Sequence, residues 1–482
     1  MNIEKIVTNL KNDTKNTSDI TYREMEVCKR KIILIYTEPL TSSDKISDFI
    51  VRSLDKINRL YKSKDNLSDI IYKEIDNFKI KKINTYEDIC YYIHYGFTVI
   101  LMEGYDHYFA LETKRDLSRG VNSPQTENAL RGAMDAFVED MQTNMGLIRR
   151  RIKNNNLWEE SLEVGRYTKT KVNIVYINGI AKKELVEKVK TAIQKIDIDG
   201  VISSGTIKNL IEKENKSVLP TVFSTERPDK TCQSLLNGKI AILVDCSQFV
   251  LILPLVMNDL FISTEDNFNK SLNITFTRII RYMSFFITLL TPAIYLAITT
   301  YNQEMLPTEL LVSFASQRAN VPFPAFFEAL AMLLSFEILR EGDLRSPTFT
   351  TSALSTVGAI ILGEAAVNAG IVSPIMIIVV AITSLSALLF TEPEMINGIR
   401  WYRIFFMLGA SLMGIVGVVI VFIYLITKLC SIKSFGVPYL YPFSPISTTG
   451  LKDSIIKFPT QKLNKREKYL SNNTIKYKDV NQ

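Results

Sequence analysis

The chain has 482 residues, a formal net charge of +7, and 57 lysines and arginines against 50 aspartates and glutamates. This length allows two or three domains. No basic stripe with interleaved aromatic residues accompanies the positive charge, so we predict no nucleic-acid partner. There are 2 histidines and 5 scattered cysteines without a CxxC pair, which argues against a histidine-dependent metal centre and a disulfide framework.

The first part of the chain predicts a flexible N-terminus and then an α/β subdomain. Residues 1–28 are polar and lack the apolar segment of a signal peptide, so we expect the soluble region to stay in the cytoplasm. Residues 29–153 form the predicted subdomain. Within it, 31–36 is an apolar run typical of a buried strand, and 97–102 and 108–112 predict a hairpin.

Apolar residues at three- and four-residue spacing predict a long helix at the end of this subdomain, from about 126 to 153. The helix ends in Arg149-Arg150-Arg151-Ile152-Lys153. Cations at a helix C-terminus complement the helix dipole, and this is the interpretation that we favour. The alternatives are a phosphate site and a contact with a neighbouring subunit.

Residues 154–272 predict a second α/β subdomain. Residues 172–177 alternate as a strand, and 183–194 have the pattern of an amphipathic helix. Two apolar runs, 239–244 and 248–253, flank a turn. The uncharged stretch 246–258 is too short to cross a bilayer, so we predict a hairpin in a protein core.

Charged residues become rare between residues 273 and 430. A bilayer core needs about 20 consecutive apolar residues per helix, and several stretches here approach that length. We therefore predict an all-α transmembrane domain with spans at about 282–303, 350–369, 373–391 and 404–427 and a membrane-associated helix at 324–341. A basic C-terminal tail, 431–482, follows and is expected to meet anionic lipid headgroups or to mark the cytoplasmic side.

Two of the predicted spans form a hairpin that contains one carboxylate. Glu364 is the only charged residue between residues 346 and 391. Gly370 can end the first helix in the left-handed conformation, and Ser373-Pro374 is typical of an N-cap followed by proline at the first helical position.

Glu364 is the strongest candidate for a functional site. Ionisable residues in membrane helices are costly and usually face a bundle interior or a water-filled path. Asn368 follows Glu364 on the same helical face, and Val357 and Ile361 precede it there. Two interpretations stay open: these residues line or gate an ion pathway, or Glu364 is a hydrogen-bonded group that holds two helices together.

Glu328 and Glu337 lie on opposite faces of the helix predicted at 324–341. We predict that they form structural ion pairs with Arg340 or Arg345. No nucleophile elbow, phosphate-binding loop or dinucleotide fingerprint occurs in the chain, so we predict neither an enzyme nor a bound cofactor.

Seven short motifs follow one another in the chain: 131–132 with 136–139, 147–151, 225–229, 336–341, 365–374 and 434–440. Together they resemble the A subunit of the GerA-type nutrient germinant receptors of endospore-forming bacteria. The resemblance extends in the same order from about residue 30 to residue 460.

The resemblance implies a multi-pass protein of the spore inner membrane with a cytoplasmic N-terminal region. It also implies a transporter-like B subunit and a lipoprotein C subunit as partners, and a homo-oligomer that conducts ions when a nutrient binds the complex. The alternatives are a secondary transporter or permease that works alone, and a non-conducting membrane scaffold that relays a signal between partner subunits.

Overall fold

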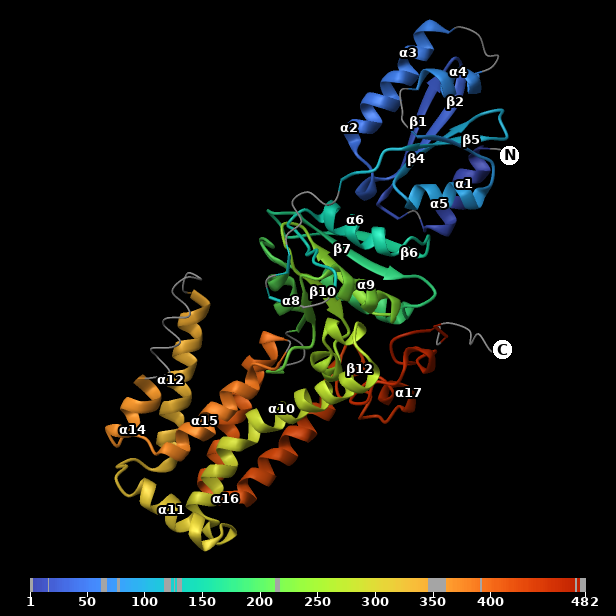
Figure 1. The fold of residues 1–482 in the computed structure, drawn as a ribbon. Coiled ribbons are helices and arrows are strands. Elements are labelled where there is room, and N and C mark those ends of the chain that lie inside the picture. The colour runs from blue at the N-terminus through green and yellow to red at the C-terminus, as the bar shows by residue number, and fades with distance from the viewer. Residues whose placement is uncertain are drawn as a thin grey trace.

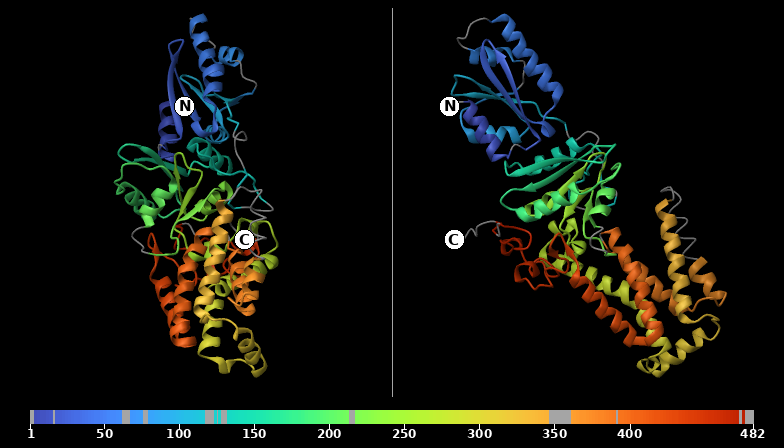
Figure 2. Two further views of the ribbon diagram at one scale, coloured as in Figure 1. Left: turned by 90° about the vertical axis from the view of Figure 1, so that its left-hand side faces the viewer. Right: turned by 180° about the vertical axis from the view of Figure 1, so that it is seen from behind.

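The computed structural model describes residues 3–15, 17–61, 67–75, 79–116, 123–124, 126–127, 132–212, 217–345, 361–390, 392–472 and 475–476. Two α/β units are followed by a helical region, and a C-terminal segment returns to the second unit (Figure 1). Figure 2 shows the first unit and the helical region at opposite ends of the molecule.

The first α/β unit is built on a five-stranded antiparallel sheet with the order β1-β2-β4-β5-β3. Its strands are β1 (Ile20–Val27), β2 (Arg30–Thr37), β3 (Ile80–Ile83), β4 (Phe97–Met102) and β5 (Tyr108–Glu112). Its helices are α1 (Ile3–Asp13), η1 (Glu38–Leu40), α2 (Ser43–Lys45), η2 (Ile46–Val51), α3 (Arg52–Leu60), α4 (Leu67–Glu74) and α5 (Tyr86–His94). The predicted hairpin is confirmed, because β4 pairs with β5.

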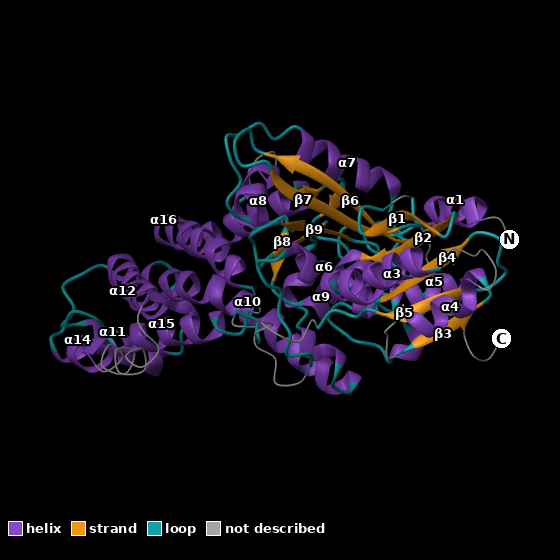
Figure 3. Cartoon of the chain, turned by 90° about the horizontal axis from the view of Figure 1, so that it is seen from above, coloured by secondary structure: helices purple, strands orange, loops and turns teal. Residues whose placement is uncertain are grey.

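Ile32 to Ile35 of strand β2 are buried in succession because helices cover both faces of the sheet (Figure 3). Successive side chains of a strand point to opposite faces. Ile33 and Ile35 pack with α1 and α5, whereas Ile32 and Leu34 pack with η2, α3 and α4.

The predicted flexible N-terminus is wrong for the described residues, since α1 and β1 both lie within 1–28. Ile3, Ile6 and Leu10 are buried in the core of the first unit. They recur at three- and four-residue spacing, which is the stripe of an amphipathic helix. The polar residues between them form its outer face and hide the stripe in the overall composition.

The second α/β unit repeats the topology of the first, with the strand order β6-β7-β9-β10-β8. Its strands are β6 (Leu157–Val164), β7 (Thr170–Ile177), β8 (Phe223–Thr225), β9 (Ile240–Val244) and β10 (Val250–Leu253). Its helices are α6 (Met141–Arg151), α7 (Lys183–Gln194), α8 (Ser204–Glu212), α9 (Pro228–Leu236), η4 (Met257–Phe261) and η5 (Thr264–Asn267). The predicted helix 183–194 coincides with α7.

Helix α6 is shorter than the helix predicted over 126–153, and it belongs to the second unit. Asp140 caps its start, where the carboxylate accepts a 3.0 Å hydrogen bond from Thr143 N. Before this cap the backbone is non-helical, and Phe137 N donates to Glu226 O at 2.7 Å. Met145 and Ile148 pack on β7 and β9, so the second unit begins before residue 154.

The helical region contains α10 (Ser271–Thr300), η6 (Gln303–Met305), α11 (Thr308–Arg318), α12 (Ala325–Arg345), η7 (Ile361–Ala365), α14 (Ala366–Asn368), α15 (Pro374–Ala387) and α16 (Pro393–Ser431). Among the described residues, α10 and α16 are long and apolar enough to cross a membrane. The first predicted hairpin helix, 350–369, lies mostly outside the described residues. Its predicted break is confirmed: Gly370 has a φ of 64°, and the Ser373 hydroxyl accepts a hydrogen bond from Met376 N.

The prediction of one span over 404–427 is wrong, because α16 is a helical hairpin that turns at Gly414. This glycine has φ 60° and ψ −139°. A Cβ at Gly417 would overlap the carbonyl oxygen of Gly409, so the two arms pack backbone to backbone. Asn302 Oδ1 accepts a 3.1 Å hydrogen bond from Ile415 N and holds the turn against the end of α10.

The C-terminal segment comprises β11 (Lys433–Ser434), β12 (Val437–Pro438), α17 (Thr448–Leu451) and η8 (Thr460–Lys462). It folds against the second unit: Ser471 forms an antiparallel bridge with Ala181, and Ser434 Oγ donates to Thr221 O at 2.7 Å. The described part of the predicted tail is therefore packed on protein. The start of α10 and the end of α16 lie on the same side of the helical region (Figure 1).

Candidate functional site

Glu337 on α12 is surrounded by arginines. Its carboxylate lies 2.9 Å from Arg400 Nη2, and 3.3 Å from Nη2 of both Arg340 and Arg403. Arg340 is a predicted partner on the same helix. Arg400 and Arg403 belong to α16, so the cluster ties α12 to the first arm of the helical hairpin.

Glu328 lies nearer the start of α12 than Glu337. It is buried and contacts Ser373, the N-cap residue of α15. Its Oε1 accepts hydrogen bonds from Ser373 N at 2.7 Å and from Ser373 Oγ at 2.5 Å. The cation facing it is Arg318, whose Nε lies 4.0 Å from Oε2. The predicted pairing of Glu328 with Arg340 or Arg345 is therefore wrong, because Arg318 comes from the preceding helix α11.

Glu364 and Asn368 are both exposed in the isolated chain. Glu364 lies in η7, a π-helical turn that starts at Ile361, and Asn368 ends α14. The prediction that Ile361, Glu364 and Asn368 share a face rests on α-helical spacing, and a π-helical turn holds more residues than an α-helical turn. Val357 lies outside the described residues.

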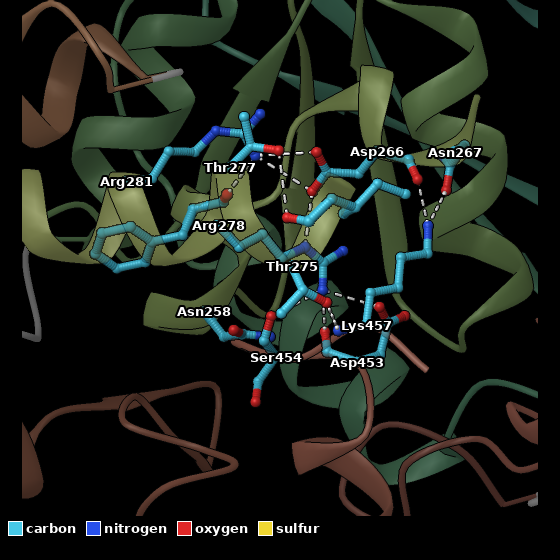
Figure 4. Close-up of polar contacts among 12 residues, drawn as sticks. Asn258, Asp266, Asn267, Thr275, Thr277, Arg278, Arg281, Asp453, Ser454 and Lys457 are labelled. Atoms are coloured by element: carbon cyan, nitrogen blue, oxygen red, sulfur yellow. Dashed lines mark hydrogen bonds and ion pairs between the residues drawn. The ribbon is translucent and has the colours of Figure 1, made fainter. Parts of the chain in front are cut away.

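A second set of charges, the junction cluster, consists of Asp266, Arg278, Arg281, Asp453 and Lys457, of which Asp266 and Arg278 are buried. It joins the end of the second unit, the start of α10 and the C-terminal segment (Figure 4). Arg278 Nε donates to Asp266 Oδ2 at 2.8 Å, and Arg281 Nη1 lies 3.0 Å from Asp266 Oδ1. Lys457 Nζ donates to the Asp266 carbonyl.

Arg278 is the centre of the junction cluster. Its side chain is 1% exposed. Besides Asp266 it reaches Asp453 Oδ1 at 3.0 Å and the carbonyl oxygens of Asp453 and Ser454 at 2.9 and 2.8 Å. One guanidinium thus holds three segments together.

The second unit also contacts the start of α16 through charges. Lys230 Nζ on α9 lies 2.9 Å from Glu127 Oε2 and 3.0 Å from Glu392 Oε1. Although burial lowers it, these two carboxylates raise the pKa of Lys230 overall. Lys208 on α8 pairs with Glu394. The second unit is therefore connected by ion pairs to both α10 and α16.

The two α/β units meet at a buried histidine. His94 is 3% exposed, and burial and then the Arg149 guanidinium lower the pKa of His94 to about 4 from 6.5. Between these pH values the unfolded chain binds a proton that the folded chain does not. Stability that is present above pH 6.5 is therefore lost as the pH falls toward 4.

From pH 6.5 to pH 5 we expect this linkage to remove about 2 kcal/mol from the free energy of unfolding. Urea unfolding of the chain at several pH values, beside a His94→Gln variant, measures it. Between pH 6.5 and pH 5 the free energy of unfolding of the variant should fall less than that of the wild-type chain, by about 2 kcal/mol. Parallel losses in the two proteins would contradict the assignment.

Sequence reasoning found the carboxylates of α12 but missed the junction cluster. Arg278 and Arg281 mark the point at which charge ends and the apolar run begins, which is typical of entry into a membrane. Their acidic partner Asp266 lies shortly before them in the chain. This proximity is the one sequence feature that could have suggested the ion pairs. Asp453 is too distant in the chain for any local pattern to connect it. No group of three or more potential metal ligands occurs among the residues that the structure describes.

These features define a class of protein: two α/β units, the second of which is joined by ion pairs to an apolar helical bundle. The model of the Bacillus/Clostridium GerA spore germination protein family matches residues 8–469. The chain therefore belongs to the GerA spore germination protein family.

Relatives are similar over most of their length. Spore germination protein KA of Bacillus subtilis (strain 168) is 37% identical over 460 residues, covering 95% of this chain and 84% of that protein. Spore germination protein GerLA of Bacillus cereus is 32% identical over 475 residues, covering 97% and 96%. The crystal structure of the N-terminal domain of the A subunit of the Bacillus megaterium spore germinant receptor GerK3 is 29% identical, with a TM-score of 0.42, and covers 52% of this chain and 94% of that chain.

Proposed function

We propose that this chain is the A subunit of a nutrient-sensing germinant receptor in the spore inner membrane. In this proposal, copies of the helical region assemble around an ion path that opens when a nutrient binds the complex with B and C subunits. Family membership supports the role in germination. The α/β units and the C-terminal segment lie on one side of the bundle, which is the cytoplasmic side.

The observation that carries the conducting role is the exposure of Glu364 in a helical region whose surface is largely apolar. Residues such as Ile378 on α15 and Leu412 on α16 are large, apolar and exposed, as lipid contact requires. A carboxylate cannot face lipid at low cost. Glu364 therefore faces water or another protein chain, as it would in an oligomer with a central path.

The test is nutrient-triggered potassium efflux from non-sporulating cells that co-express this chain with its B and C partners, using a panel of amino acids and sugars. Efflux should require this chain. Glu364→Gln should slow it roughly tenfold if the ion loses about 1.4 kcal/mol of stabilisation in the path. Glu341→Gln is the matched control, because Glu341 is exposed and pairs with Arg345 on its own helix at 2.7 Å.

A second candidate is a non-conducting relay, favoured by the arginines that neutralise Glu337 and by the junction cluster. Absence of efflux after verified assembly of all three subunits would support the relay and contradict conduction. Accumulation of the nutrient itself would instead identify a transporter.

A further inference from the structure

A cavity of about 410 Å³ lies between the two α/β units. This is within the size range of small-molecule sites. Its wall combines the end of α5, the residues after β5 and the end of α6, and is formed by Leu40, His94, Tyr95, Lys114, Arg115, Asp116, Arg150 and Lys153. Helices α5 and α6, which contribute to this wall, lie away from the helical region (Figure 1).

The lining is strongly cationic, with four basic side chains against the single carboxylate Asp116. Lys153 Nζ lies 3.9 Å from the centre of the Tyr95 ring, and Lys114 Nζ lies 4.7 Å from the same point. Two ammonium groups thus converge on one ring. Their mutual repulsion favours an anion between them.

The basic residues between Arg149 and Lys153 have two different environments. Arg149 is buried in an ion pair with Asp19, and Arg151 lies 2.6 Å from Asp135. Arg150 and Lys153 are exposed and line the cavity. On the opposite wall Lys114 and Arg115 have acidic neighbours outside the cavity, at 3.6 Å from Glu112 and 3.3 Å from Asp140.

His94 supplies a second and independent sign of a ligand. Its Nε2 is hydrogen-bonded to Asn155 Oδ1. Its Nδ1 is buried and has no hydrogen-bond partner among the described residues. Buried polar atoms in native proteins almost always have partners. With Nε2–H donating to the amide oxygen, Nδ1 of the neutral ring is an acceptor and needs a donor from a bound molecule.

We propose that this cavity binds a soluble phosphate-bearing small molecule. Arg150, Lys153, Lys114 and Arg115 hold the phosphate oxygens, and a hydroxyl of the ligand donates to His94 Nδ1. Four cations match a phosphate group of charge −2 or more better than a single carboxylate. Because the wall belongs to both units, the ligand would fix their relative position.

The test is calorimetric titration of the full chain in detergent with pyrophosphate at constant ionic strength. Wild-type protein should bind saturably. Arg150→Gln/Lys153→Gln should weaken binding at least about tenfold, since each lost charged hydrogen bond costs about 1.5–3 kcal/mol. Arg52→Gln/Lys56→Gln removes the same charge from exposed positions on α3 and should leave the Kd within about twofold.

Equal weakening of binding by both double variants would show that only the net charge matters, and it would overturn the proposal. The absence of saturable binding by the wild-type chain would also overturn it. A succinate titration separates phosphate from carboxylate recognition. Binding of succinate as tight as that of pyrophosphate would overturn the phosphate assignment.

Discussion

Replacing Arg149 by methionine is expected to lower the free energy of unfolding of the α/β region by about 3–5 kcal/mol. Arg149 and Asp19 are 0% and 2% exposed. Their two hydrogen bonds are 2.6 and 2.9 Å long, and they join α6 of the second unit to the segment before β1 of the first. Without the guanidinium, Asp19 stays buried with no counter-charge, which costs more than the pair itself contributes.

Urea unfolding followed by Trp158 fluorescence measures the effect, in a Trp401→Phe background that leaves one of the 2 tryptophans. Trp158 lies in β6 and reports on the second unit. The control Arg166→Met breaks an exposed pair with Asp197 and should not move the urea midpoint.

The double variant Arg149→Met/Asp19→Leu should recover part of the loss, because it removes both charges. Similar urea midpoints for Arg149→Met and the control would show that the buried pair contributes no more to stability than the exposed pair.

The parts of the fold that follow from local patterns could be predicted from the sequence. Strands β4 and β5 and helix α7 coincide with predicted ranges because their apolar spacing is continuous. The break at Gly370 and Ser373 was predictable because left-handed glycine and a serine N-cap are local devices. The repeated topology of the two units was not predictable, since no motif recurs between them.

The turn at Gly414 could not be predicted because its support comes from elsewhere in the chain. Residues 404–427 are uncharged and contain no proline, so they satisfy every local criterion for one membrane span. The turn depends on Asn302 at the end of α10 and on contact between Gly409 and Gly417. These small residues allow close packing within one hairpin.

Which charged residues pair with one another could likewise not be predicted from the sequence. The predicted partners, Arg340 or Arg345, lie on the same helix as Glu337. Two of the three arginines around Glu337 instead come from α16. Which cation meets which carboxylate is decided by helix packing, and this has no local signature.

Replacing Arg278 by methionine is expected to detach the C-terminal segment from the start of α10 and to block germination signalling. The buried Asp266 would lose its best partner, and the carbonyl oxygens of Asp453 and Ser454 would lose their donor. Breaking a buried pair costs about 3–5 kcal/mol. Arg278→Lys should be nearly as damaging, because an ammonium cannot reproduce the planar guanidinium that reaches Asp266 and Asp453 at once.

Hydrogen–deuterium exchange over residues 448–457 measures the detachment, and nutrient-induced germination of spores that carry the variant measures the signal. The matched control is Lys452→Met, which removes the same charge from an exposed position in the same segment. It should change neither readout. Normal exchange and normal germination in Arg278→Met would contradict the coupling role of the junction cluster. Fast exchange with normal germination would limit Arg278 to stabilising the segment, because a relay through this arginine requires both readouts to change together.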